Sequence, residues 1–417
     1  MFEWSETDEM VRAAIREFIG KEIRPHVDEL EHGDLPPYEL LRKLFAAFGI
    51  DALASDTLKK ILDKQRAREE SGEQSSAKER GSTSLLGAGG QESLGVILCS
   101  ELCGVSMGML AAMGVSMGLG AATILARGTL AQKERWLPEL VTMEKVAAWA
   151  LTEPDSGSDA FGGMKSTVRR DGDGYVLNGQ KTFITNGPYA DTTVVYAKLD
   201  EGDGTPQRDR KVLLFVLDKG MDGFVQSKPM RKMGLHSSPT GELFFDNVKL
   251  GRDRLLGETE EHKGGDGRDS AKQGFVTERV GVAAMALGVI NECQRLCVEY
   301  AKQRELWGKP IADFQLIQLK LAKMEVARIN VQNMVFNTIE RARAGKMPTL
   351  AEASAIKWYS SETATEVAMD AVQLFGGNGY MSEYRVEQLA RDAKSLMIYA
   401  GSNEVQITQT AKGLLGQ

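Results

Sequence analysis

Apolar residues near the start of the chain recur with the period of an amphipathic helix. Ser5 is a residue type that caps helix N-termini, Asp8 follows three positions later, and the apolar side chains within residues 10–19 fall on one helical face. The same period returns in the segments 94–103, 107–125 and 131–140. The pattern predicts a helical domain over residues 1–146.

One stretch inside this domain breaks the pattern. Residues 64–83 contain no large apolar side chain and are rich in Glu, Lys, Arg, Ser and Gln. Such a segment buries too little apolar surface to offset the entropy that it loses on ordering. We therefore predict a polar insertion at about residues 52–93, either a solvated helix or a surface segment, that carries no chemistry.

Around residue 147 the helical period gives way to short β-type segments separated by turn signals. These segments are 174–177, 181–185, 192–198, 211–217 and 241–245. Asn178-Gly179 is a hairpin signal, and Asn186-Gly187 is a second turn signal. The pattern predicts an all-β middle domain over residues 147–257.

The helical period resumes at about residue 275 and continues almost to the end of the chain. Its first segment, from Glu278 to about Arg304, is apolar nearly all round, which is typical of a buried helix. Pro310 and Pro348 separate the next helices, and the glycine-rich turn at 376–379 separates the last two. We predict a C-terminal helical domain over residues 258–417.

Composition and charge narrow the set of partners. The 417 residues are 42% hydrophobic and 26% charged, and the net charge of −7 provides no basic field for nucleic acid or anionic lipid. No uncharged apolar run approaches the roughly 20 residues that span a bilayer, and no signal-peptide pattern opens the chain. We expect a cytoplasmic protein that binds neither nucleic acid nor membrane.

The four cysteines and four histidines do not predict a metal site. The cysteines form two pairs at helical spacing, Cys99/Cys103 and Cys293/Cys297, inside apolar helical segments. A four-thiolate zinc site is the alternative, but the pairs lack Cys-x-x-Cys spacing, which favours buried core thiols. The histidines show no ligand spacing either.

Several motifs in register resemble one enzyme family. LTEPDSGSD at 151–159 and NGQKTFITNG at 178–187 are similar to the flavin-binding middle domain of the acyl-CoA dehydrogenases. Further blocks follow in the family's order: KMG at 232–234, FDNV at 245–248, LLGE at 255–258, RELWG at 304–308, QLFGGNGY at 373–380 and RDAK at 391–394. The resemblance covers the chain outside about 52–93. It implies an α+β fold with an N-terminal helical domain, a middle β-barrel domain and a C-terminal four-helix bundle.

The resemblance also implies an FAD site. Residues of the middle domain that it assigns to FAD are Trp149, Leu151, Thr152, Gly157, Ser158, Phe183 and Thr185. Residues that it directs to the FAD of a neighbouring subunit are Arg304, Trp307, Gln315, Gln373, Gly376 and Gly377, with Ser402 and Glu404 near the adenosine end. A site shared between chains implies a homo-oligomer, a dimer of dimers in this family. Without the resemblance, Thr185 would be a plain strand residue and Glu153-Pro154 a plain turn.

The catalytic base is the main departure from the usual family pattern. Many members place a glutamate in a C-terminal loop at the position that Ala400 occupies here. A subset that includes isovaleryl-CoA and long-chain acyl-CoA dehydrogenases instead places the base in the first turn of the long helix, directly before an arginine. Glu278-Arg279 matches that arrangement, although a glutamate there could also merely complement the helix dipole.

The resemblance assigns further roles around this base. The backbone amide of Ala400 donates to the thioester carbonyl and stabilises the developing enolate. Arg279 lies near the CoA moiety, and the other substrate contacts come from Ser158, Tyr399 and Gly401. The implied reaction is the FAD-dependent α,β-dehydrogenation of an acyl-CoA to the trans-2-enoyl-CoA, as in fatty acid β-oxidation, with electron-transferring flavoprotein as the electron acceptor.

Two alternatives remain open at this point. A flavin-dependent monooxygenase of the same fold usually lacks a base glutamate at either position, so Glu278 argues against it. One subunit of a hetero-oligomeric acyl-CoA dehydrogenase is the other alternative. Departures from the family pattern include His236 where arginine is usual, Asp155 where glycine is usual, and about five extra residues within 258–274.

Overall fold

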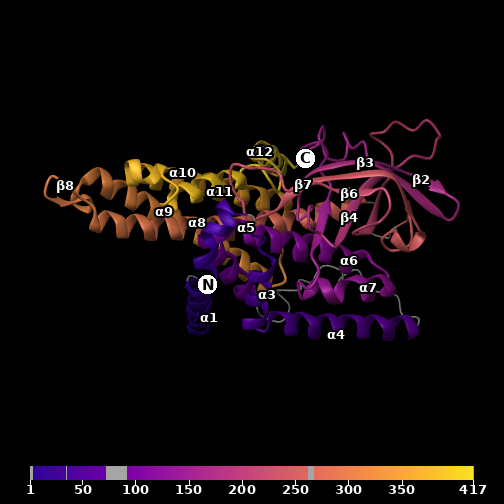
Figure 1. The fold of residues 1–417 in the computed structure, drawn as a ribbon, viewed down its shortest axis with the longest axis horizontal. Coiled ribbons are helices and arrows are strands. Elements are labelled where there is room, and N and C mark those ends of the chain that lie inside the picture. The colour runs from indigo at the N-terminus through magenta and orange to yellow at the C-terminus, as the bar shows by residue number, and fades with distance from the viewer. Residues whose placement is uncertain (1–2, 34, 72–91, 262–266, 417) are drawn as a thin grey trace.

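The structure is a computed structural model that describes residues 3–33, 35–71, 92–261 and 267–416. A curled β-sheet forms one end of the molecule and long C-terminal helices form the other, while the N-terminal helices lie along one side (Figure 1). The helical, β, helical order predicted from the sequence is therefore confirmed.

The N-terminal part is built of helices. Its elements are α1 Glu6–Phe18, η1 Ile19–Ile23, η2 Arg24–His26, α2 Val27–His32, α3 Tyr38–Ala47, α4 Ile50–Ser71, α5 Glu92–Gly114, η4 Val115–Ala121, α6 Ala122–Arg127 and α7 Leu130–Val141. Ser5 caps α1 in a reciprocal capping box with Asp8, as predicted.

The start of the predicted polar insertion is part of a helix. Helix α4 buries Ala54, Leu58 and Leu62, and its Arg66 pairs with Glu134 on α7 at 2.5 Å. The first residues of the polar stretch 64–83 therefore form a solvated helical segment, and residues 72–83 lie outside the described residues.

The middle part is one seven-stranded sheet. Its elements are β1 Ala147–Ala150, β2 Thr167–Asp171, β3 Gly174–Thr185, β4 Thr192–Leu199, β5 Val212–Asp218, β6 Phe224–Gln226, β7 Thr240–Leu250 and the short helix η5 Arg252–Arg254. The strand order is β1-β4-β2-β3-β7-β6, with β5 paired to the other edge of β4. Residues on one face of the sheet join the helical core, whereas the other face has an apolar cluster of its own.

Asn178-Gly179 does not form the predicted hairpin. Strand β3 runs through both residues, and its register with β7 shifts between Leu177 and Gly179. Gly179 has φ 146°, and a Cβ there would lie 2.3 Å from the Ser166 hydroxyl. The glycine therefore accommodates a β-bulge and a close neighbour, and the turn signal was misinterpreted. Asn186-Gly187 does end β3.

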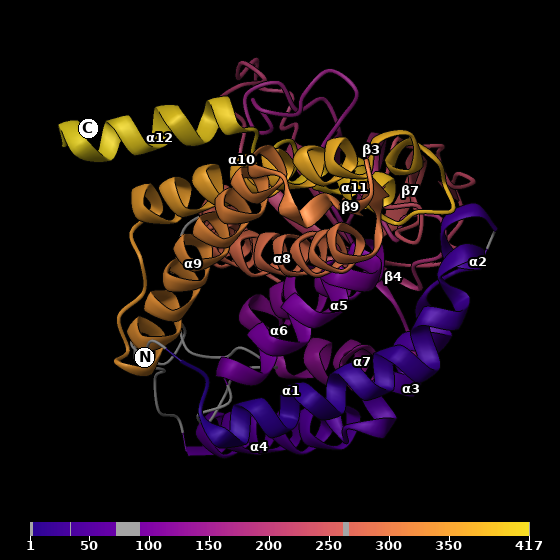
Figure 2. The same cartoon turned by 90° about the vertical axis from the view of Figure 1, so that its left-hand side faces the viewer.

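The C-terminal part contains the longest helices. Its elements are α8 Gly267–Gln303, β8 Glu305–Leu306, β9 Lys309–Pro310, η6 Ile311–Asp313, α9 Gln315–Arg343, α10 Leu350–Phe375, η7 Gly376–Tyr380, α11 Val386–Leu396 and α12 Asn403–Leu415. Helix α8 contacts α5 on one side and α9 and α10 on the other (Figure 2). The N-terminal and C-terminal helices therefore share one apolar core.

Among the residues that the structure describes, two core segments are long and apolar enough to cross a membrane by length and composition. They are Ser93–Arg127 and Gly274–Gln303. In the first, 78% of the most apolar window is buried inside the fold. Packing in the shared core accounts for this hydrophobicity, as expected for an apolar helix that other helices surround.

Candidate active site

Glu278 is a carboxylate without a hydrogen-bond partner among the described residues. Because α8 begins at Gly267, Glu278 lies inside the helix and not in its first turn, so the expected position was wrong and the alternative that Glu278 merely complements the helix dipole is excluded. The side chain keeps partial solvent access, yet it lies deep enough for desolvation to raise its pKa to about 7. The positive charges of Arg279 and Lys357 oppose that rise. A carboxyl group with these properties can exchange a proton near neutral pH.

The loop that joins α11 to α12 lies beside Glu278. Ala400 and Gly401 both have left-handed backbones, with φ of 56° and 84°. Lys357 Nζ donates to the Gly401 carbonyl at 2.8 Å, and Gln406 Nε2 donates to the carbonyls of Ala400 at 3.0 Å and Gly401 at 2.8 Å. Within the described residues, no hydrogen bond uses the amide of Ala400. This amide is available to a ligand.

Arg279 and Tyr399 border the same region. The Arg279 guanidinium is buried and donates to Ser354 Oγ at 2.9 Å, and a Cβ on Gly401 would lie 3.7 Å from it. The Tyr399 hydroxyl donates to Met285 Sδ at 3.5 Å, and burial raises the pKa of this phenol well above its usual value. The structure thus brings Arg279, Tyr399 and Gly401 to Glu278, and their contacts with substrate stay predictions.

A rigid turn follows β1 at the edge of the sheet. Lys181 Nζ is fully buried and donates to Glu153 at 2.8 Å and to the Leu151 carbonyl at 3.0 Å, while the Thr182 amide donates to the Thr152 carbonyl at 2.9 Å. Burial alone would raise the pKa of Glu153, but Lys181 and two backbone amides hold it below its usual value. Glu153 therefore has a structural role, and this is more than a plain turn.

The residues around this turn leave several donors unused. Within the described part of the chain, the hydroxyls of Thr152, Ser158 and Thr185 make no hydrogen bond, and the buried Nε1 of Trp149 has no partner. Phe183 has φ 57° and is 65% exposed, which is a strained conformation for an aromatic residue. Gly157 has open space where a Cβ would project. Free donors beside an exposed aromatic side chain fit a planar ligand such as a flavin.

The second group of predicted FAD residues lies elsewhere in the chain. All of its members are exposed, and they gather where α8, α9 and α10 end or begin, beside the β8–β9 hairpin: Arg304, Trp307, Gln315, Gln373, Gly376 and Gly377. Figure 1 shows that β8 lies at the tip of the molecule opposite the sheet. Trp307 is 87% exposed with φ 51°. One chain does not bring the two groups together, so a site shared between subunits stays a prediction. Ser402 and Glu404 lie at the start of α12.

Sequence reasoning missed three residues that hold the Ala400 loop. Lys357, Asn403 and Gln406 are buried, and none was assigned a role. Lys357 could have been noticed in the sequence, because it is the only lysine or arginine of α10. The other two lie on the polar face of a short terminal helix, where nothing in the pattern marks them.

A second buried cluster joins all three parts of the chain. Glu31 on α2 is 5% exposed, and both its carboxylate oxygens lack a hydrogen-bond partner. Its carboxylate lies 3.7 Å from His236 Nδ1 and 3.9 Å from Arg391 Nη1. Burial first, and then the neighbouring charge of Asp392, raise the pKa of Glu31 to about 7. Lys232 and Arg385 are half-buried at this junction, and burial lowers the pKa of each.

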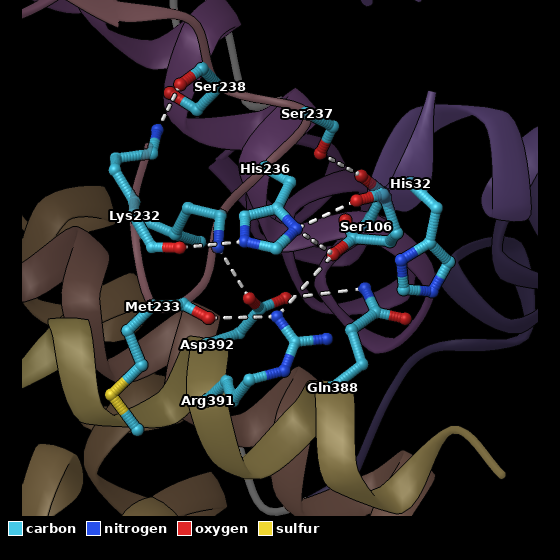
Figure 3. Close-up of polar contacts among 12 residues, drawn as sticks. His32, Ser106, Lys232, Met233, His236, Ser237, Ser238, Gln388, Arg391 and Asp392 are labelled. Atoms are coloured by element: carbon cyan, nitrogen blue, oxygen red, sulfur yellow. Dashed lines mark hydrogen bonds and ion pairs between the residues drawn. The ribbon is translucent and has the colours of Figure 1, made fainter. Parts of the chain in front are cut away.

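Hydrogen bonds around His236 fix the geometry of this cluster (Figure 3). Its Nδ1 lies 2.7 Å from the Glu31 carbonyl oxygen and its Nε2 lies 2.9 Å from the Lys232 carbonyl oxygen. Both ring nitrogens therefore face carbonyl oxygens. Asp392 accepts from the Leu235 amide at 2.6 Å and from Gln388 at 3.3 Å. Glu31 and Asp392 are enclosed by protein, whereas about a third of the His236 side chain stays exposed.

Comparison with known proteins gives three family matches along the chain. Residues 82–144, 148–248 and 265–415 match the N-terminal, middle and C-terminal domains of acyl-CoA dehydrogenase. The N-terminal match starts inside the segment 52–93, so the expectation that this whole segment falls outside the resemblance was wrong.

Individual proteins are similar over nearly the whole length. The sequence is 34% identical to 3-(aryl)acrylate reductase from Clostridium sporogenes over 99% of both chains. It is 35% identical to a caffeyl-CoA reductase–Etf complex subunit from Acetobacterium woodii over 97% of both chains. The structure of butyryl-CoA dehydrogenase from Megasphaera elsdenii matches with a TM-score of 0.83, 33% identity and 100% of both chains covered.

Proposed function

The chain belongs to the acyl-CoA dehydrogenase family, and we propose that it removes the α and β hydrogens of an acyl-CoA thioester with Glu278 as the base. Its fold is the family fold, and members of the family are oxidoreductases that use FAD. When bound, FAD supplies the acceptor for the hydride that leaves the β-carbon. The residues with free donors at the sheet edge fit this cofactor: Trp149, Thr152, Ser158 and Thr185.

The proposal rests on the Glu278 carboxylate, which has a raised pKa and makes no hydrogen bond among the described residues. The carboxylate takes the α-proton while the electron pair of that C–H bond becomes the new carbon–carbon double bond. Its pKa of about 7 makes the ionised form available at neutral pH and still leaves a strong enough base. Among the described residues, no protein group donates a hydrogen bond to the Glu278 carboxylate, so its oxygens are free to accept the proton.

The Ala400 amide has the complementary task. A donor to the thioester carbonyl stabilises negative charge that develops on that oxygen, and this lowers the barrier to α-proton removal. Because the two carbonyls that follow this amide are held by Lys357 and Gln406, the loop is fixed before substrate arrives. A preorganised donor costs no reorganisation when the charge develops.

Reduction of an enoyl-CoA is a second candidate that uses the same groups in reverse. Two relatives with 34% and 35% identity are named as reductases. In that direction, protonated Glu278 would return the proton to the α-carbon. We propose electron-transferring flavoprotein as the electron partner, supported by the Etf complex to which one of these relatives belongs. Assembly as a dimer of dimers and membership of the isovaleryl-like subset remain parts of the proposal.

An anaerobic flavin assay tests the function. The purified protein, loaded with FAD, is mixed with linear, branched and aryl-substituted acyl-CoA thioesters, and the loss of oxidised flavin absorbance is followed. The proposal predicts bleaching by at least one saturated acyl-CoA and reoxidation by electron-transferring flavoprotein. Reoxidation of the reduced enzyme by an enoyl-CoA, with no bleaching by any saturated thioester, would favour the reductase. No flavin response to any thioester would contradict both.

A further inference from the structure

Lys357 has no assigned role, and its ammonium group is completely buried in the centre of the C-terminal helices. Its Nζ donates to the Gly401 carbonyl and to Asn403 Oδ1, both at 2.8 Å. Asn403 Oδ1 also accepts from the Ser361 hydroxyl at 3.1 Å. A buried charge persists only when its donors are satisfied, so the α11–α12 loop and α10 form one polar unit.

The loop that Lys357 contacts needs an external restraint. Ala400 has φ 56°, a left-handed conformation that costs a residue with a Cβ about 1 kcal/mol or more. Among the described residues, the carbonyls of Ala400 and Gly401 accept hydrogen bonds only from the side chains of Gln406 and Lys357. Without these donors, the two peptide planes after Ala400 would be free to rotate, and the Ala400 amide would lose its fixed direction.

Lys357 also lies within electrostatic range of the base. The charged groups that surround it are Glu278 and Arg279 on α8, Glu404 on α12 and Glu362 on its own helix. Lys357 and Arg279 are the two cations whose charge acts on Glu278. The same ammonium group is therefore coupled both to the loop that carries the Ala400 amide and to the carboxylate.

We propose that Lys357 is a positioning residue of the reaction, which fixes the Ala400 loop so that its amide meets the thioester carbonyl and which favours the ionised form of Glu278. The inference rests on the proposed function, because it assigns Lys357 a task at that site. Gln406 also fixes the Ala400 loop, but it does not favour the ionised form of Glu278, since its amide is neutral.

The decisive variant is Lys357→Met, which removes the charge and the donors with little change in volume. We expect kcat to fall about tenfold to hundredfold, somewhat less than for complete loss of an oxyanion donor, while KM changes less. Loss of the cation raises the pKa of Glu278, so the acid limb of the pH profile of kcat/KM moves to higher pH by about one unit. FAD content is expected to be unchanged.

Lys198→Met provides a matched control. Lys198 is equally buried, and it donates to the carbonyls of Gly162 and Gln207 in the middle part of the chain. Its loss should lower the thermal midpoint without moving the acid limb. Gln406→Met separates the two tasks and serves if Lys357→Met does not fold: kcat should fall, and the acid limb should stay, because no charge is removed.

The outcomes separate this inference from the function itself. A wild-type enzyme that oxidises an acyl-CoA, with Lys357→Met indistinguishable from Lys198→Met in kcat and in the acid limb, would overturn the positioning role alone. If Lys357→Met fails to fold, a normal kcat in Gln406→Met would overturn it. A wild-type protein without flavin response to any thioester would overturn the proposed function and this inference together.

Discussion

Two carboxylates in this molecule, Glu278 and Glu31, have similarly raised pKa values and different surroundings. Desolvation raises the pKa of Glu278 and that of Glu31 to about 7, and neither carboxylate makes a hydrogen bond among the described residues. Glu278 keeps partial access to solvent, and its neighbour Arg279 lies against the loop that carries an unused backbone amide. Glu31 is enclosed between α2, the segment around His236 and α11.

The difference shows what marks an active site in this fold. A raised pKa alone identifies both residues, although structural ion-pair networks raise pKa values as catalytic sites do. Access for a substrate and a preorganised donor distinguish Glu278. At Glu31 a change of protonation can alter only the free energy of packing between three parts of the chain.

The largest expected effect is on kcat, which should fall when Glu278 is replaced and not when Glu31 is replaced. Replacing Glu278 by Gln keeps the volume and removes the proton acceptor, so kcat should fall by roughly 10²–10⁴. FAD content should not change. The same substitution at Glu31 should leave kcat within about twofold at pH 7, because this side chain reaches no substrate. Steady-state assays of both variants, with flavin absorbance as the measure of loading, check this; equal losses in the two would contradict the distinction.

A double variant tests whether a carboxylate at a second position in the site can replace Glu278 as the base. Glu278→Ala combined with Ala400→Glu places a carboxylate on the loop, at the position that many family members use. We expect the rate to recover at least about tenfold over Glu278→Ala alone, because a positioned base contributes roughly 10²–10⁴ in rate. Single-turnover bleaching by the preferred acyl-CoA measures it. Glu278→Ala combined with Ile398→Glu, at an exposed position of the same loop, is the control, and recovery there to the same extent would show that position does not matter.

The smallest effect is on stability at the enclosed cluster. The folded-state pKa of Glu31, about 7, exceeds its ordinary value of 4.5, so the stability associated with the protonated side chain is complete below pH 4.5 and is lost as the pH rises through 7. The loss should approach roughly 3 kcal/mol. Glu31→Gln does not titrate, so its thermal midpoint relative to wild type should increase from pH 5 to pH 8. His236→Arg should also reduce the loss, because it places a permanent cation near the carboxylate, which lies 3.7 Å from the His236 ring in the wild type.

Thermal melts at several pH values check this last prediction, with Glu29→Gln as the control. Glu29 lies on the same helix, and its side chain is exposed. A pH dependence that is the same in wild type and Glu31→Gln would show that Glu31 is ionised throughout the range.

The sequence predicted the arrangement of domains because hydrophobic period is a local property. The change of period near residue 147 coincides with β1, which begins at Ala147. The start of α8 was placed too late, because the segment from Gly267 to Gly274 is polar and resembles a loop until the sheet packs against it. The bulge at Gly179 was missed for a similar reason: only the neighbouring Ser166 shows why a glycine is needed there.

The candidate site was predictable only where a motif carried it. Glu278 and Ala400 were found together, because the absence of a glutamate at one position made the other informative. Lys357 could not be found in this way, since its partners Gly401 and Asn403 come close only when α10 packs against α12. The Glu31 cluster was not recognised, although His236 was noted as a departure from the family pattern, because Glu31, His236 and Asp392 come from distant parts of the chain.

The most direct test of Glu278 as the base is the pH dependence of anaerobic flavin bleaching at limiting acyl-CoA. The wild-type rate should rise with pH through a single limb with a midpoint at about 7, because only the ionised carboxylate accepts the α-proton. Glu278→Gln should react slowly at every pH and show no limb there. A limb at about 7 that persists in Glu278→Gln, or a variant that bleaches at the wild-type rate, would contradict the assignment.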